Sequence, residues 1–312
     1  MKIVLIILLG ILFLFILPVL GLSYILYSKL LMRPRKAPRE RVCVFPEEDE
    51  YTVMYRAGEK WFSEHEDARK PVSVKNGKLN LYGEYFDFGA KKAVVIIPGR
   101  TENCVYSAYF AEPYRAAGYN VLVIDNRSHG LSDGRVNSLG FKEYRDVEIW
   151  CRMLQEQYGI QDIWLHGVCI GCSCSLFVCT DPNRPKAIRG MTADGMFKNF
   201  YATTYNHFVE RGKPTFPILH GCMAWIHMLS GKSAIWDGPV KRIKQMQLPI
   251  LMLHSRKDTY SEPAPAQALY DSCPSKDKKL VWFDEGAHSR VRLHNTERYD
   301  ETIREYIARY VQ

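Results

Sequence analysis

The chain has 312 residues, of which 47% are hydrophobic and 24% are charged, and its formal net charge is +8 at pH 7. This balance suits a globular chain with a sizeable core, organised as one large domain or two small ones. Residues 1–41 hold seven basic residues against one acid, a net +6 that leaves only +2 for the rest. The positive charge therefore reports one basic segment and does not argue for a nucleic-acid-binding domain.

The first segment in chain order is apolar. No residue from Ile3 to Tyr27 is charged, and a helix of these residues would be about 37 Å long, enough to cross a bilayer. A cleaved signal peptide would have a shorter apolar core and a small-residue cleavage site. This run ends instead in YILYSKLLMRPRK. The sequence therefore predicts that residues 1–28 are an uncleaved, single-pass membrane anchor.

A polar and basic segment follows at residues 29–70, and we expect a juxtamembrane linker with one helix near residues 47–65. Its cluster of Lys and Arg predicts, by the positive-inside rule, that the domain after it is cytoplasmic. The cluster also suits contact with anionic lipid headgroups. The nine cysteines are irregularly spaced and form no disulfide framework, which agrees with a reducing compartment. The sequence does not indicate an oligomeric state.

Residues 71–312 predict one α/β domain. We expect a hairpin at 72–88 and helices at 144–159 and 295–311. Short apolar strands are expected at 93–97, 120–125, 162–166, 187–194, 249–255 and 279–283. Alternating strands and helices predict a mostly parallel sheet of about eight strands with helices on both faces.

Two helices are expected within residues 195–248, at 197–211 and 216–230, and we interpret this region as a small helical cap. The second helix is rich in Met, Trp, His and Ile. Its apolar side chains suit either ordinary packing on the sheet or a wall around an acyl or aryl group.

Cys169 lies three residues after the predicted strand 162–166, and Gly167 and Gly171 flank it. A nucleophile at a sharp turn from strand to helix needs small neighbours, because the backbones approach closely there. The free N–H groups at the start of the helix favour a thiolate at this point. Cys169 is therefore a candidate nucleophile.

Asp258 follows the predicted strand 249–255, and His288 follows the predicted strand 279–283. The chain order is nucleophile, acid and histidine, each past a different strand, which is the order of α/β hydrolases. Parallel sheets bind ligands at the carboxyl ends of their strands. The joint arrangement predicts a Cys169–Asp258–His288 triad.

A family resemblance rests on five segments: GYNVLVIDNRSHGLSDGR (118–135), LGFKEYRDVEIW (139–150), IWLHGVCIGCS (163–173), PILMLHSRKD (249–258) and GAHS (286–289). With these, residues from about 72 to 311 resemble the α/β-hydrolase superfamily. The likeness is to its bacterial membrane-anchored branch, called serine-aminopeptidase-like or prolyl-oligopeptidase-like. It implies that His129 is structural and is not the catalytic base.

The chain departs from the family pattern at three places. Cys169 replaces the usual Ser, Pro98-Gly99 replaces a His-Gly pair after the third strand, and Ser128 replaces a Gly. The first departure changes the nucleophile, and the second alters the entrance to the oxyanion site. No triad position is lost.

The resemblance implies acyl chemistry without a metal or organic cofactor. His288, oriented by Asp258, would take the proton of Cys169, and the sulfur would attack an acyl carbonyl. The N–H of Ile170 and a second N–H near Arg100 would hold the oxyanion, and water would then clear the thioester. Superfamily members with Cys–Asp–His triads include dienelactone hydrolases and bile-acid-CoA amino-acid acyltransferases, so hydrolysis and acyl transfer both remain open.

Other interpretations of the cysteines also remain open. Cys169 and Cys172 form a C-x-x-C that suits a redox pair or a regulatory disulfide. With Cys174 and Cys179 they could bind zinc, although four ligands along one helix are unlike usual tetrahedral sites. Ser173 is an alternative nucleophile, but its position falls inside the helix.

Two further alternatives concern the altered loop at residues 98–100. An altered oxyanion loop is also expected in a non-catalytic binding protein that has a hydrolase fold. Arg100 itself is either a solvated loop residue or a guanidinium that binds a carboxylate or phosphate of the substrate.

Overall fold

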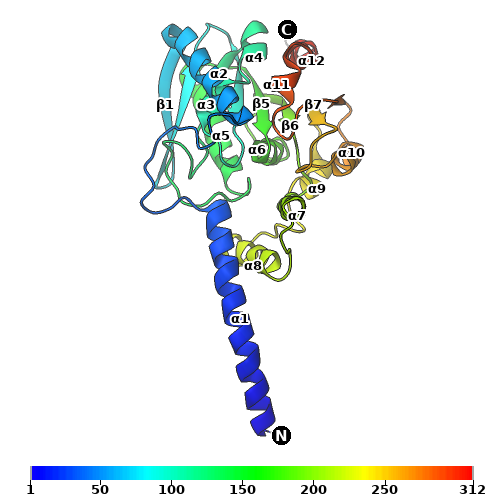
Figure 1. Ribbon diagram of the computed structural model, residues 1–312. Coiled ribbons are helices and arrows are strands. Elements are labelled where there is room, and N and C mark those ends of the chain that lie inside the picture. The colour runs from blue at the N-terminus through cyan, green and yellow to red at the C-terminus, as the bar shows by residue number, and fades with distance from the viewer. Residues whose placement is uncertain (1, 311–312) are drawn as a thin grey trace.

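The computed structural model describes residues 2–310, with side chains from Phe13 onward. A long N-terminal helix, α1 (Lys2–Leu31), projects from a domain in which a single sheet lies between two layers of helices (Figure 1). Its segment Phe13–Leu31 has a mean hydropathy of 1.8 and is long and apolar enough to cross a membrane. Phe13, Leu14 and Phe15 are exposed, as expected of a helix that faces lipid.

The sheet has eight strands in the order β1-β2-β4-β3-β5-β6-β7-β8. They are β1 (Arg69–Asn76), β2 (Leu79–Phe86), β3 (Lys92–Ile97), β4 (Asn120–Ile124), β5 (Asp162–Val168), β6 (Ile188–Asp194), β7 (Ile250–Ser255) and β8 (Lys278–Phe283). Only β2 runs antiparallel to its neighbours β1 and β4; the other pairs are parallel. The predicted fold class is confirmed, because each apolar run forms a strand that is covered on both faces.

Helices cover both faces of the sheet. One face packs against α5 (Glu143–Tyr158), α6 (Ile170–Cys179) and α10 (Pro263–Ser272). The other packs against α2 (Glu50–Glu64), α3 (Cys104–Ala108), α4 (Glu112–Ala116), α11 (Val291–His294) and α12 (Thr296–Ala308). The short 3-10 helix η1 (Glu66–Ala68) leads into β1. The two faces therefore form two apolar cores separated by the sheet.

The region after β6 contains α7 (Phe200–Glu210), α8 (Ile218–Ser230), α9 (Pro239–Arg242) and the 3-10 helix η2 (Ile243–Gln245). Both helices predicted for the cap are present. Helix α8 packs along α1 (Figure 1). The Trp225 indole donates to the Leu20 carbonyl at 3.1 Å, and its ring meets Tyr24 edge-on at 5.1 Å. Gly221 lies against Ser23, where a Cβ would collide. The apolar side chains of α8 therefore pack on α1, a partner that the sequence analysis did not consider.

The structure differs from the predicted linker at residues 29–70. Beyond α1, this segment is bound to the domain, and it contains α2, η1 and the start of β1. Arg33 donates to the carbonyls of Ser132 and Gly130 at 2.9 and 2.8 Å. Arg41 pairs with Glu84 and donates to Asp125 at 2.8 Å. A charged guanidinium can be buried when carboxylates pair with it, but sequence spacing could not identify partners so far along the chain.

This arrangement leaves fewer basic residues for lipid. Lys29, Arg35 and Lys36 are exposed, whereas Arg33 and Arg41 are at least half-buried. The expected contact of the basic cluster with anionic headgroups is therefore limited to the exposed members.

Candidate active site

Cys169 occupies the sharp turn between β5 and α6. Its backbone has φ +52° and ψ −111°, a conformation that costs free energy in a residue with a side chain. Gly167 and Gly171 are required here. A Cβ on Gly171 would collide with the carbonyl of Ile97, and a Cβ on Gly167 would collide with the carbonyl of Gly171. The flanking glycines thus have the close-approach role inferred from their spacing, and the turn leaves the Cys169 side chain half-buried.

The structure brings Asp258 and His288 together. The Nδ1 of His288 lies 2.8 Å from Asp258 Oδ2, and the backbone N–H groups of Tyr260 and Ser261 donate to Asp258 Oδ1 at 2.9 and 2.7 Å. Asp258 therefore receives hydrogen bonds on both oxygens. The Nδ1–H of His288 donates to Asp258, which leaves Nε2 as the basic nitrogen.

The charges of this group are linked. Burial alone would lower the pKa of His288, but the negative charges of Asp258 and Cys169 raise it well above its usual value. Burial would raise the pKa of Asp258, and the facing His288 lowers it instead. The Nε2 of His288 is buried and has no hydrogen-bond partner within the described residues. An imidazole held in this way is suited to exchange a proton with a nearby sulfur.

The sequence analysis expected the backbone N–H groups of Ile170 and Arg100 at an oxyanion site. Ile170 is the first residue of α6, so its N–H lacks a partner within the helix. The Arg100 N–H follows Gly99, whose own N–H donates to Glu102 Oε2 at 2.7 Å. His129 holds the carbonyl of Arg100 through Nε2, which is a structural contact of the kind that the resemblance implied.

The Arg100 side chain is bonded to α1. Its Nη1 donates to the Leu30 carbonyl, at the end of α1, at 3.1 Å. The guanidinium satisfies one of the carbonyls that a helix leaves unpaired at its C-terminus. This contact offers a structural alternative to the predicted role in substrate binding.

Two side chains near the site were missed by the sequence analysis. Glu102 is buried, and burial raises its pKa to about 7 despite the Gly99 N–H and the positive charge of His288. Tyr51, on α2, donates its hydroxyl to the His288 carbonyl at 3.3 Å. Neither carries a motif. Tyr51 belongs to the segment interpreted as a linker, so no pattern in the sequence would have located it.

The other cysteines of α6 face away from a shared site. Cys172 is buried, and its thiol donates to the carbonyls of Gly167 and Asp194 at 3.1 and 3.3 Å. Burial raises the pKa of Cys179 to about 12 and the pKa values of Cys172 and Cys174 well above normal. These three thiols are poor nucleophiles and fill the core.

The remaining alternatives can be placed as well. Ser173 is fully buried within α6, against Gly140, and does not reach the turn. Among residues 2–310, no three His, Cys, Asp or Glu side chains are grouped as a metal site would require.

Comparison with known proteins agrees with this geometry. Residues 92–220 match the family described as alpha/beta hydrolase fold, and residues 227–292 match the family described as serine aminopeptidase, S33. The chain therefore has the α/β-hydrolase fold.

Particular relatives extend the comparison. YqkD of Bacillus subtilis (strain 168) is 26% identical over 220 residues, which covers 69% of this chain and 70% of YqkD. The membrane protein YNL320W of Saccharomyces cerevisiae is 22% identical over 195 residues, 62% of each chain. The Pyrococcus furiosus esterase Pf2001 superposes with a TM-score of 0.64 at 20% identity, covering 80% of this chain and 95% of the esterase.

Proposed function

We propose that the chain is a membrane-anchored hydrolase that cleaves an ester, thioester or amide through Cys169, Asp258 and His288. The observation that carries the proposal is the imidazole of His288, which Asp258 holds at 2.8 Å and whose pKa the neighbouring Cys169 side chain raises. Its buried Nε2 meets no other hydrogen-bond partner among the described residues. The similarity in fold to an esterase supports the reaction class.

The reaction has two stages. The Cys169 sulfur attacks the acyl carbonyl, and the oxyanion accepts hydrogen bonds from the N–H groups of Ile170 and Arg100. The bond to the leaving group breaks, and His288 gives it the proton that came from the thiol. His288 then takes a proton from water, which attacks the thioester, releases the acid and restores the thiol.

Anchoring in a membrane is part of the same proposal. It is supported by the length and hydropathy of Phe13–Leu31 and by the yeast relative, which is named a membrane protein. The basic residues that follow α1 favour a cytoplasmic domain with one crossing.

The test is an intact-mass measurement of the full chain in detergent after incubation with panels of acyl thioesters and p-nitrophenyl esters. We expect an acyl adduct on wild type and none on Cys169→Ala, which leaves no nucleophilic side chain at the turn. Cys43→Ser is the matched control, because Cys43 is the other half-buried cysteine. If water removes the adduct faster from wild type than from His288→Ala, the result supports hydrolysis.

Two other outcomes define the alternatives. An adduct that clears only when an amine or thiol is added identifies an acyltransferase. If no donor leaves an adduct and the same esters raise the unfolding temperature of wild type and Cys169→Ala equally, the chain is a binding protein.

A further inference from the structure

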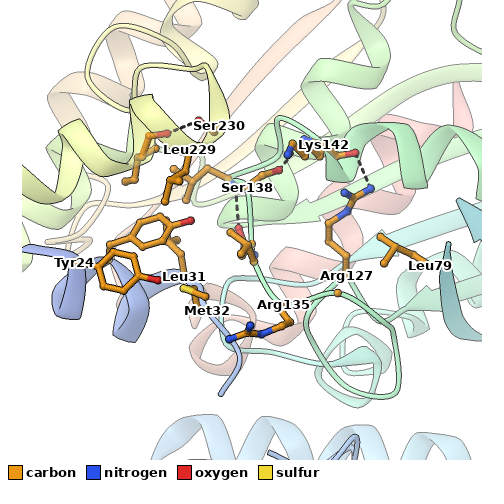
Figure 2. Close-up of a pocket in the computed structure, with 16 residues that line it drawn as sticks. Tyr24, Leu31, Met32, Leu79, Arg127, Arg135, Ser138, Lys142, Leu229 and Ser230 are labelled. Carbon is orange, nitrogen blue, oxygen red and sulfur yellow. Dashed lines mark hydrogen bonds between the residues drawn. The ribbon is translucent and has the colours of Figure 1, made fainter. Parts of the chain in front are cut away.

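A cavity of about 460 Å³ lies where α1, α8 and the loop after β4 meet (Figure 2). None of the residues that line it belongs to the proposed triad. We propose that this cavity binds one anionic phospholipid of the membrane that α1 enters, as a ligand and not as the substrate. The proposal rests on the membrane anchor proposed above.

The first argument is depth. The uncharged run Ile3–Tyr27 is longer than the about 20 residues of helix that cross the hydrocarbon of a bilayer, and Lys29 is the first charged residue after it, so the boundary of the hydrocarbon falls in the last turns of α1. The cavity is bordered by this end of the helix, through Tyr24, Leu31 and Met32. Tyr24 packs against Trp225 of α8, and paired aromatic rings of this kind are typical of the headgroup level. The cavity therefore opens at the height of lipid phosphates.

The second argument is charge. Three basic residues and no acidic residue line the cavity. Arg127 is already neutralised, because it donates two hydrogen bonds of 2.6 Å to Asp146. Arg135 and Lys142 are exposed, and within residues 13–310 neither is paired with a carboxylate. Two lining cations without a carboxylate partner suit a phosphodiester, whose negative charge they can balance.

The third argument is that the two sides of the cavity differ in polarity. Figure 2 shows Lys142 and Arg127 across the cavity from Tyr24 and Leu229. Leu229 is half exposed although it borders a hollow. A ligand with a charged head and an apolar chain can satisfy both walls at once, which neither a free phosphate nor a neutral hydrocarbon can do.

The experiment uses the full chain in nanodiscs of phosphatidylcholine, with and without phosphatidylglycerol. The protein is then moved into neutral detergent, and retained lipid is counted by native mass spectrometry. We expect one phosphatidylglycerol per wild-type chain and little retained phosphatidylcholine. Each cation near a lipid phosphate is worth about fivefold in binding, so Arg135→Ala with Lys142→Ala should reduce retention by about 25-fold.

Matched variants separate a built site from general attraction. Arg35→Ala with Lys36→Ala removes two exposed cations that do not line the cavity and should leave retention unchanged. Leu229→Trp should fill the apolar wall and displace the lipid, whereas Met228→Trp, on an exposed neighbour outside the lining, should not. Glycerol phosphate in excess should not compete.

Several results would overturn the proposal. Equal losses in the two cation pairs would show surface attraction only, and effective competition by glycerol phosphate would show a phosphate site without a chain site. If the chain enters nanodiscs normally but retains no phosphatidylglycerol, the cavity proposal is wrong and the proposed anchor is unaffected. Failure of wild type to incorporate removes the anchor and the cavity proposal with it. Loss of retention in Cys169→Ser would mean that the lipid occupies the acyl site.

Discussion

The guanidinium of Arg100 donates a hydrogen bond of 3.1 Å to the carbonyl of Leu30, the penultimate residue of α1. Arg100 is also the residue whose backbone N–H we propose for the oxyanion site. One residue therefore joins the end of the membrane-directed helix to the loop that borders the Cys169 turn. Its side chain and its backbone serve different parts of the molecule.

Arg100→Ala tests whether this side chain recognises substrate. Because the guanidinium lies on Leu30, we expect the variant to change kcat/KM for neutral and anionic esters by the same factor. A reduction of about tenfold would correspond to the loss of one charge-assisted hydrogen bond. Steady-state kinetics on a matched ester pair checks this. A rise in KM confined to anionic esters would restore the substrate-binding role.

Arg41→Ala should destabilise the domain strongly. It leaves the buried carboxylate of Asp125 without its guanidinium partner, while Glu84 keeps only Arg69, at a cost of about 3–5 kcal/mol. Arg39→Ala is the control: its side chain is 57% exposed in its pair with Asp133, so a loss of at most about 1 kcal/mol is expected. Thermal unfolding in detergent compares them. Equal effects would mean that residues 33–49 are a loose linker after all.

Glu102→Gln should change how stability depends on pH. The pKa of Glu102 is raised from 4.5 to about 7. Its protonated form is therefore preferred in the folded state, and this contribution is complete below pH 4.5 and is lost as the pH rises through about 7. The full loss is about 3 kcal/mol.

The glutamine can still accept from the Gly99 N–H, so the variant should lose less stability between about pH 5 and 8 than wild type does. Denaturation series across pH measure this slope. Glu297→Gln, on an exposed glutamate of α12, should keep the wild-type slope. The buried Asp194, whose pKa is raised to about 6, should preserve part of the slope in every variant.

Alkylation should distinguish Cys169 from its neighbours. Seven of the nine cysteines are buried, and only Cys43 and Cys169 are partly exposed. In the native chain we expect iodoacetamide to modify these two alone. His288→Ala should slow modification of Cys169 by about tenfold or more, because the imidazolium no longer favours the thiolate.

Peptide mapping of the modified chain checks this result, and Cys43 provides an internal standard in the same sample. If Cys169 reacted no faster than Cys172, it would not be an activated nucleophile. Modification of Cys172 in the native chain would revive the redox interpretation of the C-x-x-C.

Much of the fold could be predicted because the signals are local. Strands such as β3 and β4 are short apolar runs, and the hairpin of β1 and β2 turns at Gly77, which has φ +58°. The candidate triad could also be predicted, because each member directly follows a strand and parallel strands end at one edge.

The remainder depends on contacts between distant segments. In the sequence, Arg41 lies in a polar segment that is typical of a linker. Its structural role depends on Glu84 and Asp125, which are distant in the chain. The apolar face of α8 was consistent with any buried surface. The contacts of Gly221 with Ser23 and of Trp225 with Leu20 and Tyr24 identify α1 as its partner. Helical periodicity shows that a face is apolar but does not show which element covers it.

The bound course of residues 32–49 has a mechanical consequence. A flexible linker of this length would have an end-to-end distance of about 25 Å and would let the domain move over that range relative to its anchor. Here the hydrogen bonds of Arg33 and Arg41 hold this segment on the domain, and α8 packs the cap against α1. The Cys169 turn should therefore stay at a fixed distance from the membrane of the proposed anchor. A substrate of the proposed hydrolase would then be selected by how far its scissile bond protrudes from the lipid surface as well as by its chemistry.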